Sequence, residues 1–262
     1  MVRVSDIATA IEEFAPLPLQ EDYDNAGLQV GDPGARVSAV LLCLDVTHEV
    51  LAEARQRGCG MVVSHHPLIF RGLKSLTGAD ETQRLVMSAL ADGIAVYSAH
   101  TNLDSAWGGV SHEMASGFDV VDIEVLEPHQ GRTDAGLGVV GNLARPLPKL
   151  EFLRRVKEKF GVRCLRYSAQ SPQLVVKRAA FCGGSGASLI RRAIDARADV
   201  YVTGDIKYHD FAGFGLDIIL ADIGHYESEL CSMRIFSRII REKYPDLVVY
   251  FSEEQSNPIA II

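Results

Sequence analysis

The sequence predicts an α/β fold of two domains, each with a mixed, largely parallel sheet and helices packed on it. Two observations support this prediction. Short apolar runs rich in β-branched residues alternate with helical patterns, which is typical of βα units. The chain has 262 residues and so exceeds the usual domain size of roughly 100–150 residues. The apolar runs cover residues 37–46, 60–66, 93–100, 178–184, 198–205 and 217–225.

The expected domain boundaries follow from a break in this alternation. Residues 136–143 (GLGVVGNL) predict an antiparallel strand, and residues 149–160 predict a new helix before the alternation resumes. The closing apolar run of the chain predicts a strand whose sheet partner lies in the first domain. We therefore expect a discontinuous first α/β domain at 1–127 plus 236–262, and a second α/β domain at 128–235.

Composition argues against two classes of partner. The formal net charge of -8 and the pI near 5.5 offer no basic surface for a phosphate backbone, so nucleic acid is disfavoured. No stretch approaches the roughly 20 apolar residues of a membrane span. The N-terminal segment carries acidic residues where a signal peptide needs an apolar core. We therefore expect a cytoplasmic protein with no membrane partner.

Cysteine usage limits the kind of metal site that the chain can form. The sequence has five cysteines, which are scattered and form no CxxC pair. An odd number without such pairs fits neither a disulfide framework nor a cysteine-type zinc site. Any metal must therefore be bound by nitrogen and oxygen atoms.

Ionisable residues follow four of the predicted strands at their C-terminal ends. In an open parallel sheet these ends line the ligand cleft, and histidines with carboxylates are the composition that a hydrolytic metal site needs. We therefore expect a metal site in the cleft at these strand ends. The residues concerned are His65, His66, His100, Asp104, Asp205, His225 and Glu229.

The spacing of two pairs favours metal binding, although each pair also has a structural interpretation. His65 and His66 are adjacent imidazoles ahead of Pro67, and such a pair is difficult to satisfy in a core without a shared cation. His225 and Glu229 are four residues apart, so on a helix both can reach one ion. They could also belong to a solvated helix face.

His100 and Asp104 are also four residues apart, in a segment that could form a helical turn or a loop. We assign Asp104 as a metal ligand and His100 as a residue that orients the ligands. A lone histidine at a strand end is more often a hydrogen-bonded structural residue, and that alternative stays open for each histidine.

Two further segments could bind substrate. Gly183 and Gly184 of FCGGSG lie between a predicted strand and a predicted helix, where backbone N–H groups could bind an anion, but a tight turn explains them equally well. The segment lacks the Lys-Ser/Thr ending of a P-loop. In TGDIKYHD, Asp205, Lys207 and His209 could approach substrate or form a buried ion network.

Six segments taken together resemble one protein family. In chain order they are YDNAGLQVGD, SHHPLIF, SAHTNLD, FCGGSG, TGDIKYHD and DIGHYESE. The same segments occur in this order in the GTP cyclohydrolase I type 2 homologs, also called dinuclear-metal-centre hexameric proteins or the interacting-factor-three-like family. The resemblance extends from about Asp24 to Glu229, which is nearly the whole chain.

The resemblance implies two divalent metal ions per subunit and five ligand positions, with the glutamate bridging the metals. These positions fall on His65, His66, Asp104, His225 and Glu229. The resemblance also implies two α/β domains, a C-terminal strand that returns to the first domain, and a ring-shaped homo-hexamer. The metal could be zinc, iron, manganese or magnesium, since a His/carboxylate set without cysteine admits all four.

These observations lead to two functional hypotheses. The first is a metal-dependent hydrolase of a nucleotide or a related small molecule, either GTP cyclohydrolase-like or a phosphoesterase, in which two ions lower the pKa of a bound water. His100, Asp205 or His209 would transfer protons, and the glycine-rich segment with Lys207 would contact phosphates. The alternative is a metal-binding hexameric scaffold or interaction protein without catalysis.

Overall fold

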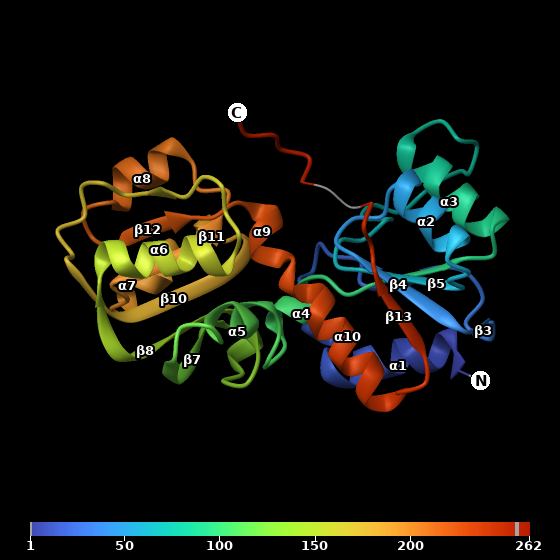
Figure 1. Ribbon diagram of the computed structural model, residues 1–262, viewed down its shortest axis with the longest axis horizontal. Helices are drawn as coiled ribbons and strands as arrows, with labels where there is room; N and C mark the ends of the chain where they lie inside the picture. The colour runs from blue at the N-terminus through green and yellow to red at the C-terminus, as the bar shows by residue number, and fades with distance from the viewer. Residues whose placement is uncertain (1, 255–256) are drawn as a thin grey trace. The chain divides into compact units, whose positions relative to one another are not determined.

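The computed structural model describes residues 2–254 and 257–262. The chain divides into two compact units, and each is described by itself (Figure 1). Unit 1 consists of Met1–Leu103 with Ser232–Pro258, and unit 2 consists of Asp104–Cys231 with Ile259–Ile262. Both units combine a sheet with helices, so the predicted α/β fold is confirmed.

The division differs from the predicted boundaries in one substantial segment. Residues 104–127 belong to unit 2, although we expected them in the first domain. The reason is strand pairing, because β7 (Val120–Pro128) forms an antiparallel ladder with β8 (Gly136–Pro148). At the other boundary the difference is small: unit 2 ends its main segment at Cys231 rather than at residue 235.

Unit 1 is built around a five-stranded sheet. Its strands are β2 (Gly27–Val30), β4 (Ala39–Cys43), β5 (Met61–Ser64), β6 (Ala95–Ser98) and β13 (Val248–Phe251), in the order β13-β4-β5-β6-β2. The strands β13, β4, β5 and β6 are parallel, and β2 is antiparallel to β6. Every residue of β4, β5 and β6 is buried, as expected of parallel strands covered on both faces. The predicted return of the C-terminal strand to this sheet is confirmed by β13.

The other elements of unit 1 are helices and one short strand pair. They are α1 (Val4–Phe14), η1 (Leu17–Leu19), α2 (His48–Gln56), α3 (Glu81–Ala91), α10 (Cys231–Lys243), and the antiparallel pair β1 (Val2–Arg3) and β3 (Arg36–Val37). Side-chain caps start two of the helices. Thr47 Oγ1 accepts a hydrogen bond from Val50 N at 3.2 Å, and Asp80 Oδ1 accepts one from Gln83 N at 2.9 Å. The apolar faces of α2 and α3 join one core cluster with the sheet.

Unit 2 is built around a six-stranded sheet that is more mixed. Besides β7 and β8 it contains β9 (Arg166–Tyr167), β10 (Val175–Ser185), β11 (Val200–Gly204) and β12 (Ile219–Asp222), in the order β7-β8-β10-β11-β12-β9. The strands β10, β11 and β12 are parallel. The strand predicted from GLGVVGNL lies in β8 and is antiparallel to both neighbours, as predicted.

Helices and single helical turns accompany this second sheet. They are α4 (Thr101–Ser105), α5 (Val110–Ala115), η2 (His129–Gly131), α6 (Lys149–Lys159), η3 (Ala187–Leu189), α7 (Ile190–Asp195), α8 (Tyr208–Phe214) and α9 (His225–Glu229). The division between the units falls within α4. Ile190 and Ala193 of α7 join one buried cluster with Tyr201 and Leu220 of the sheet. The helix predicted at 149–160 is α6.

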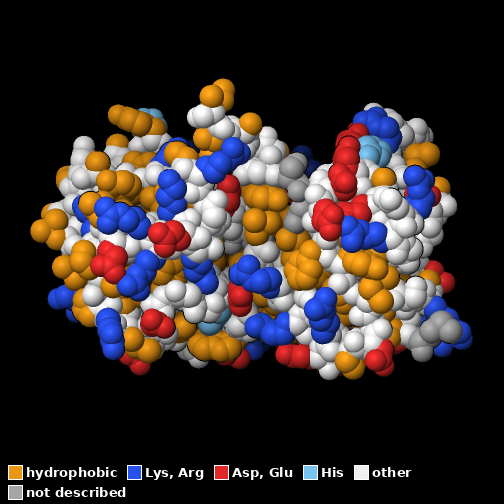
Figure 2. Space-filling model, in the orientation of Figure 1, with side chains coloured by type: hydrophobic (Ala, Val, Ile, Leu, Met, Phe, Trp, Pro, Cys, Tyr) orange, Lys and Arg blue, Asp and Glu red, His pale blue; other side chains and the backbone are white. Residues whose placement is uncertain are grey.

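Two surface properties bear on possible partners. Within the part of the chain that the structure describes, no helix is both long and apolar enough to cross a membrane. On the face seen in Figure 2, acidic and basic side chains are interspersed over the described residues. On this face the mixed distribution differs from the basic stripe that a nucleic-acid backbone requires.

Candidate metal centre

Unit 1 brings three histidines together at the C-terminal ends of neighbouring strands. His65 and His66 directly follow β5, and His100 follows β6, which is parallel to β5. Their candidate ligand atoms all lie within 4.8 Å of one another. His65 is fully buried, and the other two histidines are partly buried. Three imidazoles this close can bind a divalent cation, so His100 is a candidate ligand as well as an orienting residue.

Oxygen acceptors hold the Nδ1 atoms of His65 and His66. His65 Nδ1 lies 2.8 Å from the carbonyl oxygen of Ala99, and His66 Nδ1 lies 2.7 Å from Asp45 Oδ1. Because a carbonyl or carboxylate oxygen can only accept a hydrogen bond, the proton belongs on Nδ1, and Nε2 of the neutral ring carries the lone pair. Metal-binding histidines almost always have this arrangement.

Asp24 holds His100 in the same way. Asp24 Oδ1 lies 2.8 Å from His100 Nδ1, and Oδ2 accepts hydrogen bonds from the backbone N of Thr101, at 2.9 Å, and from the Thr101 hydroxyl. Burial of this unexposed carboxyl raises its pKa, but the hydrogen bonds from His100 and Thr101 outweigh burial and lower the pKa of Asp24 to about 2. Asp24 is therefore ionised at neutral pH.

Unit 2 contains a second cluster around His225, the first residue of α9. His225 Nδ1 lies 2.8 Å from Asp205 Oδ2, and His225 Nε2 lies 3.0 Å from Glu229 Oε2. The hydrogen bond to Glu229 outweighs burial and raises the pKa of His225 to about 9. Asp205 follows β11 with a φ of 57°, a left-handed conformation that aspartate tolerates better than most residues. His225 and Glu229 thus share one helix, as predicted.

Asp222, the last residue of β12, connects the two turns that carry this cluster. Its Oδ2 accepts a hydrogen bond from Ile206 N at 3.1 Å, and its Oδ1 accepts one from Gly224 N at 2.9 Å. Arg166 forms an ion pair with the same buried carboxylate. Asp222 therefore fixes the backbone directly after Asp205 and directly before His225.

Two carboxylates of unit 2 lie close together. Candidate ligand oxygens of Asp104 in α4 and Glu229 in α9 are within 4.8 Å of each other, and Glu229 is only 3% exposed. Burial raises the pKa of the nearby Cys182 thiol to about 12, and the negative charge of Asp104 contributes to this rise. Carboxylates at this separation repel each other unless a proton or a cation neutralises them, so the pair favours cation binding.

The glycines of FCGGSG make room for Glu229 and do not form an open anion loop. Gly183 and Gly184 lie in β10, and Gly184 N already donates a hydrogen bond to Ser228 Oγ at 2.9 Å. A Cβ at Gly184 would lie 2.2 Å from Glu229 Oε1, and one at Gly183 would lie 2.6 Å from Val110 Cγ1. The structure therefore favours a packing role for these glycines over the predicted phosphate contact.

Lys207 and His209 are both exposed at the start of α8. Lys207 N donates a hydrogen bond to Asp210 Oδ2 at 3.0 Å, which caps the helix, and the ring of His209 lies 5.4 Å from that of Tyr208. Their exposure excludes the buried ion network that we considered for this segment. Contact with substrate is the alternative that this exposure permits.

Sequence reasoning missed three residues that position the candidate ligands, namely Asp24, Asp45 and Asp222. Asp45 and Asp222 occur at the C-terminal ends of predicted strands, the same signal that identified the histidines, and this signal could have found them. Asp24 precedes its strand and lies 76 residues from His100 in the sequence, so no local pattern connects the two.

Replacement of Gly184 by alanine tests how tightly Glu229 is enclosed. Gly161 is a matched control, because both glycines have a left-handed φ (61° and 63°) but an added Cβ would meet other atoms within 4 Å only at Gly184. Gly161→Ala should cost about 1 kcal/mol of unfolding free energy, and Gly184→Ala should cost roughly 1–3 kcal/mol more. Urea denaturation measures both values, and equal losses would contradict this account.

Comparison with known proteins identifies the family. Residues 2–258 match the family described as Duf34/NIF3 (NGG1p interacting factor 3). The chain is 37% identical to the "GTP cyclohydrolase 1 type 2 homolog" of Lactococcus lactis subsp. lactis, with 98% of both chains covered, and 34% identical to that of Clostridium perfringens, with 100% of both covered. It resembles the solved structure of Staphylococcus aureus protein SA1388 with a TM-score of 0.88 at 28% identity, over 99% of each chain. The chain belongs to the Duf34/NIF3 family.

Proposed function

We propose that the chain binds two divalent metal ions through His65, His66, Asp104, His225 and Glu229 and uses them to hydrolyse a nucleotide or a related small molecule. One observation carries this proposal. Each of these histidines has its Nδ1 bonded to a carboxylate or carbonyl oxygen, which makes Nε2 the nitrogen that a metal would bind. The resemblance to the family supports the same ligand set.

The donor atoms fit divalent ions that prefer nitrogen and oxygen ligands. Asp104 and Glu229 supply negative charge and the histidines supply neutral nitrogen, a combination that zinc, iron, manganese and magnesium all accept. Five protein ligands shared by two ions leave positions for water and substrate, as in catalytic sites. When bound, two such ions would activate water and polarise the bond that it attacks.

The remaining polar residues receive distinct roles in this proposal. His100 would move the proton, because Asp24 fixes its Nδ1 and its ring lies beside the other two histidines of unit 1. Asp205 would orient His225 and would not transfer protons itself, since its carboxylate is bonded to His225 Nδ1. His209 on the exposed start of α8 stays a proposed proton donor.

Replacement of Glu229 by glutamine tests the metal proposal. The buried carboxylate would bridge both ions, so Glu229→Gln should reduce the metal content from about two ions per chain and lower hydrolysis by at least about 100-fold. Metal content is measured by inductively coupled plasma mass spectrometry, and hydrolysis is measured on a panel that includes GTP and simple phosphoesters.

Glu227→Gln is the matched control, because Glu227 lies on the same helix and is not among the proposed ligands. This variant should keep both metal and activity. A wild-type chain that holds no metal, either as purified or after reconstitution, would contradict the proposal. That result would favour the alternative of a scaffold or interaction protein.

Lys207 is the residue that we propose for phosphate binding. It is exposed in the turn that follows Asp205, and a charge-assisted hydrogen bond to phosphate would account for roughly a tenfold change in affinity. Lys207→Ala should therefore weaken GTP binding by about that factor in isothermal titration calorimetry, with metal content unchanged. Lys177→Ala, another exposed lysine of unit 2, is the control. Unchanged affinity in Lys207→Ala would remove Lys207 from the site.

The resemblance also supports a homo-oligomer, and we propose a hexamer. Native mass spectrometry of the purified protein should give six times the chain mass of 28.6 kDa. A monomeric mass at micromolar concentration would contradict this proposal without affecting the metal proposal, because metal content is measured independently.

A further inference from the structure

The short strand β9 places Arg166 directly opposite Asp222. The two residues are register partners in the antiparallel pair of β9 with β12. Ser168, which follows β9, continues this pairing: its N donates a hydrogen bond to Leu220 O at 3.0 Å, and its Oγ accepts one from Leu220 N at 2.9 Å. β9 is therefore fixed on the sheet, and with it the position from which the Arg166 side chain starts.

The Arg166 guanidinium holds the turn after β11 as well as Asp222. Its Nη2 donates hydrogen bonds to Ile206 O, at 3.0 Å, and to Asp222 Oδ2. Ile206 N donates to the same carboxylate oxygen at 3.1 Å. Both backbone polar groups of Ile206 are thus bonded to this ion pair, which we call the Arg166–Asp222 clamp.

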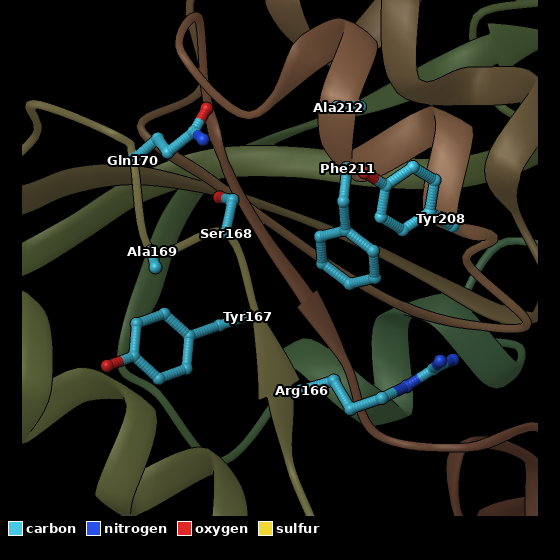
Figure 3. A pocket seen from close by; sticks show the side chains of 8 residues that line it. All are labelled: Arg166, Tyr167, Ser168, Ala169, Gln170, Tyr208, Phe211 and Ala212. Carbon is cyan, nitrogen blue, oxygen red and sulfur yellow. The ribbon is translucent and has the colours of Figure 1, made fainter.

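The path of the Arg166 side chain is set by its neighbours. Figure 3 shows it extending from β9 on the side of Phe211 and Tyr208, whereas Tyr167 extends the opposite way, as alternation along a strand requires. Its guanidinium carbon lies 5.8 Å from the ring centroid of Phe211, a favourable position for a cation. The side chain is 58% exposed, so its replacement leaves no buried cavity.

The clamp holds two turns whose backbones are in unusual conformations. Asp205 has a φ of 57° and Gly224 a φ of 88°, and the left-handed region is sparsely populated by residues other than glycine, so surrounding contacts must maintain it at Asp205. Asp222 reaches both turns, because its Oδ1 accepts a hydrogen bond from Gly224 N at 2.9 Å. The turns also pack closely: a Cβ at Gly204 would lie 2.8 Å from His225 N.

His225 depends on a fixed turn more than His65 does. The oxygen that holds His65 Nδ1 is the backbone carbonyl of Ala99, directly after a buried strand. The oxygen that holds His225 Nδ1 belongs to the Asp205 side chain, which is 45% exposed. Such a side chain can orient an imidazole only if the turn that carries it does not move.

The exposure of Arg166 does not make it a dispensable surface charge. Ion pairs between two exposed side chains contribute little, but Asp222 is only 3% exposed. Loss of one partner of a pair leaves a buried charge uncompensated. The carboxylate of Asp222 then shifts or draws in water, and either response disturbs the N–H groups of Ile206 and Gly224 that it holds.

We propose that Arg166 is a positioning residue for the metal centre, which acts through Asp222 to fix the turns of Asp205 and His225 and so directs His225 Nε2 toward the metal. The role in metal binding rests on the proposed function. The clamp itself does not, because neither Arg166 nor Asp222 is among the proposed ligands.

Hydrogen exchange of the metal-free chain, followed by NMR, tests the clamp alone. Arg166→Met should speed exchange of the Ile206 and Gly224 amides by about tenfold, because their hydrogen-bond acceptor is no longer held. Arg191→Met is the matched control. Arg191 is another exposed arginine of unit 2, and its guanidinium carbon lies 5.1 Å from the ring centroid of Phe214. This control should leave both amides unchanged, and unchanged exchange in Arg166→Met would overturn the proposal.

Zinc affinity, measured by competition with a chromophoric chelator, tests the consequence for the metal centre. Arg166→Met should weaken zinc binding by about 10–100-fold, as expected of a residue that supports a ligand. Arg191→Met should bind zinc as the wild type does. Arg166→Lys should recover part of the loss, because it keeps a positive charge beside Asp222.

A double variant tests whether Arg166 acts through Asp222. In the Asp222→Asn background, Arg166→Met should cause no further loss of zinc affinity, because the clamp is already broken. Additive losses would overturn the proposal, as would full zinc affinity in Arg166→Met or an equal loss in Arg191→Met. If Asp222→Asn does not fold, the two arginine variants decide. A wild-type chain without zinc affinity would contradict the proposed function, and hydrogen exchange would still decide whether the clamp exists.

Discussion

The hydrogen bond that each candidate ligand histidine makes through Nδ1 is the interaction on which the site depends. An imidazole on a flexible turn could present either nitrogen, but here Ala99 O, Asp45 and Asp205 hold the Nδ1 side. The parallel strands make this possible, because their C-terminal ends place successive turns next to one another. The buried strands therefore serve as a rigid base, and the polar turns after them determine which ring nitrogen can bind a metal.

The charges in unit 2 also favour the binding of a cation. Asp104 and Glu229 bring two carboxylates together, with His225 bonded to Glu229 and its pKa raised to about 9. A proton on His225 balances part of this negative charge in the absence of metal, and a divalent cation would balance more of it. The absence of a side chain at Gly184 is what allows the Glu229 carboxylate to occupy this position.

Much of the fold could be predicted because its strands are nearly continuous apolar runs, and polar residues at their ends marked the candidate ligands. The positioning residues were harder to predict. Asp24 reaches His100 across 76 residues, and Arg166 reaches Asp222 across 56, so their roles depend on tertiary contacts that no local pattern contains. The packing role of Gly183 and Gly184 could not be predicted either. It depends on the side chains of Val110 and Glu229, which are distant in the sequence and contact these glycines only in the folded chain.

In each of His65, His66 and His225, Nε2 is the atom that we expect to bind metal. X-ray diffraction from zinc-loaded crystals, recorded on both sides of the zinc absorption edge, tests this claim directly. We expect two anomalous peaks per chain, with His65, His66 and His225 ligating through Nε2 at roughly 2.0–2.1 Å and with Nδ1 of each ring still bonded to its present oxygen acceptor. Ligation through Nδ1, or the absence of anomalous peaks at these residues, would contradict the account.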